Sequence, residues 1–193
     1  FPDPNASLMA LSSSSPSPIG VAIAGLGFGE SVHLKALASQ PDLRAVALWH
    51  PRRERLDQAC LEHNLPGYDD WEALLSDPRV QAVIIATPPE PRFALALQAL
   101  KAGKHLLLEK PVALKAELVA ELQRVAIQNR LSVAVDYEYR AVPLFMQAAR
   151  MLEAGAVGTP WLVKLDWLMS SRADASRPWS WYSQRDAGGG VLG

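Results

Sequence analysis

The sequence has little of what several classes of protein require. Cys60 is its single cysteine, so neither an internal disulfide framework nor a thiolate metal site can form within the 193 residues. No segment stays apolar over the roughly 20 residues that a transmembrane helix needs. The formal net charge is -1, which provides no electrostatic basis for binding nucleic acid or an anionic membrane. These absences predict a globular protein of a reducing, cytoplasmic compartment, without nucleic-acid or membrane partners.

The first 18 residues are poor in apolar side chains and rich in serine and proline. They lack the basic start and the long apolar run of a secretory signal peptide. Their small apolar surface cannot offset the entropy that would be lost on folding. We therefore expect residues 1–18 to form a disordered leader.

From Ile19 onward, short apolar runs alternate with segments that suit helices. The expected strands cover residues 20–24, 44–49, 80–86, 106–108 and 131–135, and the expected helices cover 31–39, 52–63, 71–75, 93–102 and 115–129. Strands that are joined by single helices form a parallel sheet with right-handed crossovers. We therefore predict a doubly wound α/β domain of the Rossmann type over residues 19–140.

The pattern changes after Arg140. We expect a helix over residues 144–153 and a strand over 161–167, where aromatic and aliphatic residues recur with a period of two. One helix and one strand cannot complete a sheet domain. Residues 141–193 are therefore expected to be the incomplete start of a second, α+β domain for substrate, which further sequence or another chain would complete.

A glycine-rich loop, residues 25–29 (G-L-G-F-G), joins the first strand to the first helix. Gly25 permits a tight turn, and Gly27 lets the backbone approach a pyrophosphate, at which the helix aims its free N–H groups. Glu30 stands in place of the third glycine of the G-x-G-x-x-G pattern, so we expect Gly29 to make the close helix–strand contact. Because the loop lies between a strand and a helix, it predicts a dinucleotide site formed by Gly25, Gly27, Phe28 and Gly29.

The end of the second strand indicates which dinucleotide is bound. NAD sites, like those of methyl transferases that use S-adenosylmethionine, usually place a carboxylate there for the ribose hydroxyls. This chain has His50-Pro51-Arg52-Arg53 instead. Two arginines can hold the 2′-phosphate of NADP, so His50, Arg52 and Arg53 are predicted to bind the cofactor, with NADP favoured and NAD left open. The alternative is that both arginines are solvated residues in the first turn of a helix.

Three further motifs follow the loop in order: Ala86-Thr87-Pro88-Pro89, Ala102-Gly103-Lys104-His105 and Glu109-Lys110-Pro111. Together with the loop they resemble the family of glucose–fructose oxidoreductase, inositol dehydrogenase and MocA (Gfo/Idh/MocA). The resemblance runs from about Gly20 to the last residue. It implies an NAD(P)-dependent oxidoreductase that transfers a hydride between the nicotinamide and a sugar, a cyclitol or a related carbonyl or alcohol substrate.

The same resemblance implies roles for individual residues. Thr87 and Pro88 would lie along the cofactor, and Glu109 and Lys110 would face both the nicotinamide and the substrate. Lys110 occupies the position of the family's catalytic lysine, where its amine can donate to a substrate oxygen and stabilise charge that develops during hydride transfer. In its complete form, such a protein would form a homo-oligomer through the second domain.

Two departures from the family pattern leave an alternative open. Many members carry a histidine in the segment where this chain has Glu90-Pro91-Arg92-Phe93. Residues 188–193 resemble the start of a glycine-rich segment, but the catalytic histidine of its G-x-H-x-x-D pattern would come only after Gly193. A nucleotide-binding protein without catalysis, either regulatory or truncated, is therefore the alternative. We expect the chain's own histidines to be structural or solvated: His33, His50, His63 and His105.

Several residues near the predicted domain boundary have two interpretations. Tyr139 and Arg140 follow the carboxyl end of a strand, and they either border the cleft or pack between the domains. Trp161 and Trp167 are expected to pack within a sheet. Trp179 and Trp181 either stack on a sugar ring or pack against protein.

Overall fold

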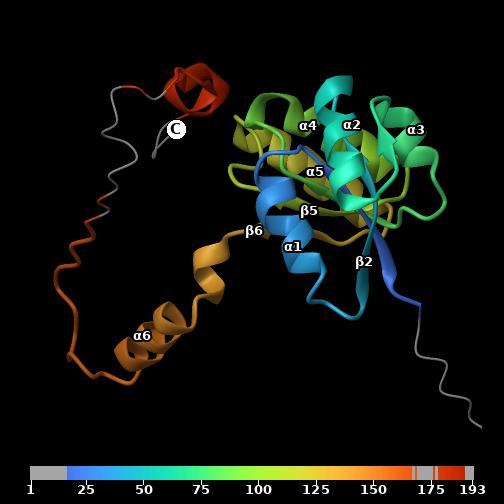
Figure 1. Cartoon of the computed structure of the whole chain (residues 1–193). Helices are drawn as coiled ribbons and strands as arrows, with labels where there is room; N and C mark the ends of the chain where they lie inside the picture. Colours follow the sequence, from blue (N-terminus) through green and yellow to red (C-terminus); the bar gives the residue numbers. More distant parts are fainter. Residues whose placement is uncertain (1–16, 167, 169–175, 177, 190–193) are drawn as a thin grey trace, which may run out of the picture.

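The computed structural model describes residues 17–166, 168, 176 and 178–189 (Figure 1). Most of the expected leader, residues 1–16, therefore lies outside the described residues, as do Trp167 and residues 190–193. In the part of the chain that is described, no helix is both long and apolar enough to cross a membrane.

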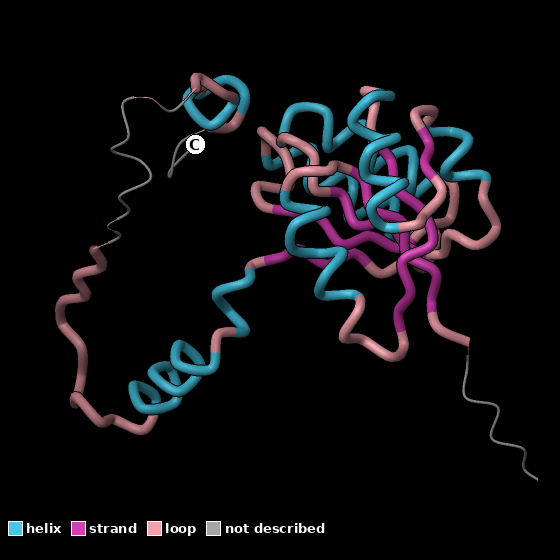
Figure 2. Tube along the Cα trace, in the orientation of Figure 1, coloured by secondary structure: helices cyan, strands magenta, loops and turns pink. Residues whose placement is uncertain are grey.

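A six-stranded parallel sheet forms the centre of the fold (Figure 2). Its strands are β1 (Ile19–Ala24), β2 (Leu43–Trp49), β3 (Gly67–Tyr68), β4 (Ala82–Ile85), β5 (His105–Glu109) and β6 (Val133–Asp136). They lie in the order β3-β2-β1-β4-β5-β6, which confirms the predicted doubly wound Rossmann sheet. In such sheets ligands bind at the carboxyl ends of the strands, where the strand order reverses. Here the reversal lies between β1 and β4.

Helices cover both faces of the sheet (Figure 2). They are η1 (Gly29–His33), α1 (Leu34–Leu37), α2 (Arg53–His63), α3 (Trp71–Ser76), α4 (Pro89–Lys101) and α5 (Ala116–Gln128). The Asp70 carboxylate caps α3, because it accepts hydrogen bonds from the backbone N–H groups of Glu72 (2.8 Å) and Ala73 (3.3 Å). Helix α4 begins at Pro89 rather than at the predicted Phe93, since a proline in the first turn has no N–H that would need a partner.

Apolar side chains fill the space on both sides of the sheet. Successive residues of a strand point to opposite faces, so Val21 and Ile23 pack in one cluster while Ala22 and Ala24 pack in the other. The two clusters hold the strands rigidly and therefore also fix the position of their carboxyl ends. Leucines from the helices complete the clusters: Leu37 and Leu56 in the first, and Leu74, Leu100 and Leu122 in the second.

Beyond β6 the chain leaves the sheet (Figure 1), forming η2 (Glu138–Ala141) and α6 (Pro143–Glu153), a helix without buried residues. The strand expected over 161–167 is wrong for its described part, because residues 161–166 form no strand. Trp161 is 91 % exposed instead of packed. A strand needs a neighbour to which it can hydrogen-bond, and the described residues provide none here. The assignment of residues 141–193 to a second domain stays a prediction.

The chain returns to the body of the fold at η4 (Trp181–Ser183) and η5 (Arg185–Ala187). A Cβ atom added to Gly188 would lie 2.7 Å from Leu114 Cδ2 and 3.1 Å from Pro89 Cβ. The segment therefore packs closely against the start of α4. Trp181 stacks on Tyr182, with ring centroids 3.8 Å apart, so the indole of Trp181 packs against protein.

Asp77, directly after α3, shows how a buried carboxylate stabilises this fold. Its oxygens accept hydrogen bonds from the Arg79 guanidinium (2.7 Å at the shortest), from the Arg79 backbone N–H (2.9 Å) and from the Tyr68 hydroxyl (2.9 Å). These hydrogen bonds, chiefly those from Arg79, hold the pKa of Asp77 well below its usual range in spite of its burial. The carboxylate is therefore charged in the folded protein at neutral pH.

We expect Asp77→Asn to lower the free energy of unfolding at neutral pH by about 2 kcal/mol, because it weakens hydrogen bonds to a charged group. The folded-state pKa is depressed, so ionised Asp77 contributes stability above the unfolded-state pKa of about 4 and loses that contribution as the pH falls below it. Urea unfolding should therefore show a smaller difference between wild type and variant at about pH 3. Asp57→Asn changes an exposed carboxylate of α2 and is the control. Equal losses from both substitutions would contradict this account.

Candidate active site

Four turns meet at the carboxyl edge of the sheet, where the strand order reverses. They follow strands that lie side by side, since Ile85 of β4 pairs with both Ala24 of β1 and Leu108 of β5, and β6 pairs with β5. Parts of the chain that are distant in sequence thus come together. The turns carry, in spatial order, the glycine loop, Thr87 and Pro88, Glu109 and Lys110, and residues 137–140.

The glycine loop has the backbone that a close approach to phosphate requires. Gly25 has a φ of +100°, and a Cβ added to it would lie 2.8 Å from the carbonyl carbon and oxygen of Ala86. A Cβ at Gly29 would lie 2.8 Å from Ile23 Cγ2, so Gly29 makes the close helix–strand contact expected of it. No described atom lies within 4 Å of a Cβ added to Gly27. Space is therefore open where a pyrophosphate would approach the backbone.

Glu30, which replaces the third glycine, has its partners on α2. Its carboxylate accepts a hydrogen bond from Arg55 and lies 3.1 Å from Nε2 of His63. Arg55 also donates to the carbonyl oxygen of Leu26 (2.9 Å), so it ties the loop to α2. The negative charge of Glu30 is thus balanced within the protein. Nothing in the sequence identifies Arg55 as the partner of Glu30, apart from the general rule that a buried carboxylate needs a partner.

The turn after β2 adjoins the glycine loop, because the Gly25 N–H donates to the Trp49 carbonyl oxygen (3.1 Å). His50 and Arg52 lie in this turn, and the backbone N–H of Arg52 donates to Nδ1 of His50 (3.1 Å). Burial lowers the pKa of His50, so its ring is neutral at neutral pH. The structure thus places both residues next to the predicted nucleotide site.

Arg53 is exposed at the start of α2 and is held by two carboxylates. Its guanidinium donates to Asp57 (2.9 Å) and to Asp69 (3.3 Å). The hydrogen bond to Asp69, followed by the charges of both acids, raises the pKa of Arg53. A phosphate would therefore have to compete with two carboxylates for the guanidinium of Arg53. The same competition does not apply to Arg52, because these hydrogen bonds are made by Arg53.

Thr87 is buried in the turn after β4, and its hydroxyl has no hydrogen-bond partner among the described residues. A buried hydroxyl without a partner costs free energy, which a hydrogen-bonding ligand would recover. This hydroxyl and the open space at Gly27 both lie at the junction of β1 and β4. Together they fit a nucleotide that runs along the edge of the sheet.

A buried polar cluster joins three of the elements at this edge. His33 Nε2 lies 2.9 Å from Glu109 Oε1 and 3.8 Å from Asp136 Oδ2. His33 is buried, and its expected structural role stays a prediction. Its partner Glu109 lies 76 positions away in the chain, so this contact could not be inferred from the sequence. The contact with His33 holds the Glu109 carboxylate in place. That Glu109 faces the nicotinamide and the substrate stays a prediction.

The pKa values of the two carboxylates in this cluster are shifted in opposite directions. Burial opposes the ionisation of Glu109, but the hydrogen bond from His33 and the charges of His33 and Lys110 outweigh it and lower the pKa of Glu109. Burial, followed by the negative charge of Glu109, raises the pKa of Asp136. Glu109 therefore keeps its negative charge to a lower pH than an ordinary glutamate. Its second oxygen accepts a hydrogen bond from the Lys110 backbone N–H (3.3 Å).

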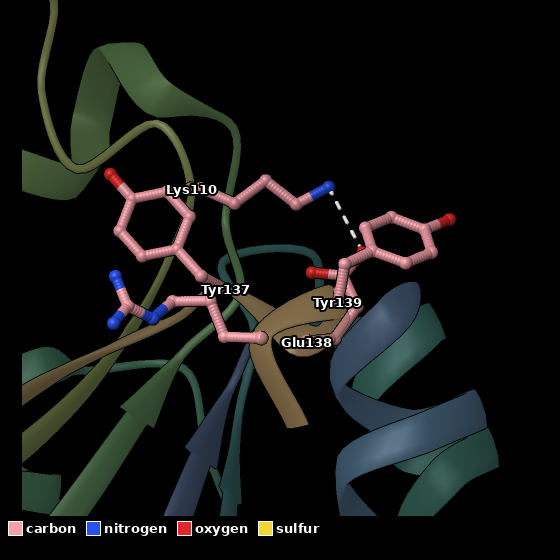
Figure 3. A pocket seen from close by; sticks show the side chains of 5 residues that line it. Lys110, Tyr137, Glu138 and Tyr139 are labelled. Carbon is pink, nitrogen blue, oxygen red and sulfur yellow. Dashed lines mark ion pairs between the residues drawn. The ribbon is translucent and has the colours of Figure 1, made fainter. Parts of the chain in front are cut away.

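Lys110 extends along a cavity of about 390 Å³ at the same edge (Figure 3). Its Nζ atom lies 3.3 Å from Oε1 of Glu138, and the two side chains are 44 % and 35 % exposed. An amine and a carboxylate in one cavity can donate to and accept from the hydroxyl groups of a small molecule. The cavity is lined by Lys110, Tyr137, Glu138, Tyr139 and Arg140.

A place at the cleft and packing at the domain boundary do not exclude each other for Tyr139 and Arg140. Both border the cavity, and Tyr139 also contacts Phe145 of α6, with ring centroids 6.0 Å apart. Tyr137 and Glu138 were missed, although they directly follow the last strand of the sheet. The feature of the sequence that could have identified them is this position, because residues that follow parallel strands gather at the ligand-binding edge of the sheet.

Comparison with known protein families matches residues 19–137 to the GFO_IDH_MocA family, described as an oxidoreductase family with an NAD-binding Rossmann fold. An uncharacterized oxidoreductase of Synechocystis sp. is 42% identical over 173 residues, which cover 89% of this chain and 47% of the relative. Levoglucosan dehydrogenase of Pseudarthrobacter phenanthrenivorans is 30% identical over 181 residues, covering 89% of this chain and 46% of the relative. This chain spans about half the length of these curated relatives.

Solved structures share the architecture. A 3-ketoreductase of Actinomadura kijaniata, crystallised in complex with NADP, has a TM-score of 0.70 and 27% identity, covering 74% of this chain and 46% of that one. Apo scyllo-inositol dehydrogenase of Lactobacillus casei has a TM-score of 0.67 and 25% identity, covering 74% and 43%. Both similarities agree with the Rossmann fold described above.

Proposed function

The chain belongs to the Gfo/Idh/MocA family of oxidoreductases with an NAD-binding Rossmann fold, and from this membership we propose that it serves hydride transfer between a nicotinamide cofactor and a small substrate. The substrate class is a sugar, a cyclitol or a related carbonyl or alcohol compound. One observation carries the proposal: the Lys110 amine extends into a cavity at the carboxyl edge of the sheet. The names of two relatives, a levoglucosan dehydrogenase and a scyllo-inositol 2-dehydrogenase, support the substrate class.

NADP is the proposed cofactor, and NAD is the second candidate. The pyrophosphate would lie against Gly25, Gly27 and Gly29, and the Thr87 hydroxyl would make a hydrogen bond to the bound nucleotide. The 2′-phosphate would be held at the turn that carries Arg52 and Arg53. The family is described by NAD, whereas the similar 3-ketoreductase was crystallised with NADP, so the choice depends on these arginines.

In the proposed reaction, the bound nicotinamide supplies or accepts the hydride. Lys110 donates to the substrate oxygen and stabilises the charge that develops on it. Glu138, 3.3 Å from the amine, orients Lys110 within the cavity. Tyr137 and Tyr139 offer aromatic faces against which the apolar side of a ring can pack.

Calorimetric titration of the chain with NADPH, NADH and S-adenosylmethionine tests the cofactor proposal. We expect both nicotinamide nucleotides to bind and S-adenosylmethionine not to bind. Binding of S-adenosylmethionine alone would refute the oxidoreductase function. The intact protein should then be assayed with a panel of sugars and cyclitols. Cofactor binding without turnover of any of them would favour a regulatory, non-catalytic function.

The preference between the two nucleotides is expected to depend more on Arg52 than on Arg53. Arg52→Gln should weaken NADPH binding by about 10-fold, because a hydrogen bond to a charged group contributes about 1.5 kcal/mol or more. Arg53→Gln should have a smaller effect, since Asp57 and Asp69 already engage that guanidinium. NADH binding should be unchanged in both variants, because NADH lacks the 2′-phosphate.

Arg44→Gln is the matched control, because it removes an exposed arginine near the amino end of β2. Dissociation constants of all three variants can be measured by calorimetry with both nucleotides. If wild type bound NADH at least as tightly as NADPH, the role given to Arg52 and Arg53 would be wrong.

A further inference from the structure

Arg92, in the first turns of α4, is the most deeply buried charged side chain among the described residues, at 2 % exposure. Its guanidinium donates to three backbone carbonyl groups. Nη1 donates to the carbonyl oxygen of Glu109 (2.6 Å) and to that of Pro111, and Nη2 donates to that of Thr87. One side chain thus joins the turn after β4 to the turn after β5.

The burial of this charge is not explained by an ion pair. Burial lowers the pKa of Arg92 to about 10, an effect that the Glu109 carboxylate partly offsets, so the guanidinium stays charged at neutral pH. The Glu109 carboxylate makes its hydrogen bond to His33, and Arg92 bonds to the Glu109 carbonyl oxygen instead. A buried charge of this kind is often less stabilising than an apolar side chain of the same volume. Its arrangement therefore points to a role in placing the carbonyl groups.

The geometry of arginine suits this role. Its planar fork has five N–H donors in fixed directions, whereas the ammonium group of lysine is a compact point charge. Nη1 holds the carbonyl groups of the two residues that flank Lys110 in the chain, and Nη2 holds Thr87. The direction in which the Lys110 side chain enters the cavity (Figure 3) thus depends on a turn that Arg92 holds.

We propose that Arg92 is a positioning residue, which holds the turn of Lys110 at a set distance from the nucleotide-binding turn at Thr87. This inference rests on the proposed function, because Lys110 must reach a substrate that lies against the nicotinamide. Arg92 itself is buried and acts only through these two turns. A displacement of about 1 Å between reacting groups can lower a rate by about 100-fold.

The test compares Arg92→Met, which removes the fork but keeps apolar bulk, with Arg92→Lys, which keeps the charge. Hydrogen exchange, followed by mass spectrometry, should be about 10-fold faster in Arg92→Met for peptides that cover residues 86–89 and 109–113, but unchanged in β1 and β2. In the intact protein, kcat should fall by about 100-fold while KM stays within about threefold, and Arg92→Lys should recover part of the loss. Arg79→Met, which removes the partner of Asp77 before β4, should change neither the exchange of the two turns nor kcat.

Wild-type exchange in both turns of Arg92→Met, or a wild-type kcat, would overturn the proposal. Faster exchange throughout the domain with a normal kcat would also overturn it, because that result would show a purely structural role. If Arg92→Met does not fold, Arg92→Lys decides: faster exchange confined to the two turns with a lower kcat supports the proposal, and wild-type values overturn it. A wild-type protein that binds neither NADPH nor NADH would instead refute the proposed function, while the exchange pattern would still decide whether Arg92 holds the two turns.

Discussion

Replacement of Lys110 by alanine is expected to lower kcat by about 10²- to 10³-fold while NADPH affinity stays within about threefold of wild type. The substitution removes the amine that extends along the cavity beside Glu138, so proton donation and charge stabilisation at the substrate oxygen are lost. The predicted nucleotide contacts lie mainly in other turns, at the glycine loop and at Thr87. Steady-state kinetics of the intact protein and calorimetry with NADPH measure the two effects separately.

Lys101→Ala is the control for this experiment, because Lys101 is an exposed lysine at the end of α4. It should retain the wild-type kcat. Lys110→Arg keeps a positive charge but changes its shape and proton donation, so an intermediate kcat is expected. An unimpaired Lys110→Ala variant would refute the role of Lys110. A loss of NADPH affinity that accounted for the whole defect would assign Lys110 to cofactor binding alone.

Gly25→Ala is expected to lower the free energy of unfolding by about 3 kcal/mol or more and to abolish nucleotide binding. Two causes act together. A φ of +100° is strained for any L-amino acid with a side chain, and the new Cβ would lie 2.8 Å from the backbone of Ala86. Neighbouring β-strands hold that backbone, so it cannot move away at low cost. Urea unfolding and NADPH titration of the variant measure both losses.

Gly27→Ala is the matched comparison, because it adds the same atom to the same loop in open space. The free energy of unfolding of the cofactor-free protein should change by less than about 1 kcal/mol. NADPH affinity should nevertheless fall by about 10-fold or more, since the methyl group would stand where the pyrophosphate approaches the backbone. If Gly27→Ala bound NADPH as tightly as wild type, the glycine loop would not be the pyrophosphate site.

Signals that act within a few residues were sufficient to predict much of the candidate site. Apolar runs predicted the parallel strands, and Thr87 and Lys110 were placed at the correct edge because parallel strands all end on the same side. The expected helix over residues 93–102 omits the first turn of α4, because the sequence pattern does not show whether a proline there begins a helix or only ends a strand. The strand expected over 161–167 was wrong in its described part for a different reason. Alternation of apolar and polar residues is a property of one segment, but a strand forms only beside another strand.

Residues that are close in the chain were enough to predict the glycine loop, the motifs that resemble the family and the alternation of strands and helices. The short strand β3 was not predicted, because two residues form no pattern. Which groups meet at the sheet edge depends on how the strands are arranged in space. The tertiary structure paired His33 with Glu109, brought Lys110 to Glu138, and bonded Arg92 to carbonyl groups of two turns. These contacts follow from the side-by-side order of six strands, which places residues next to each other regardless of how far apart they lie along the chain.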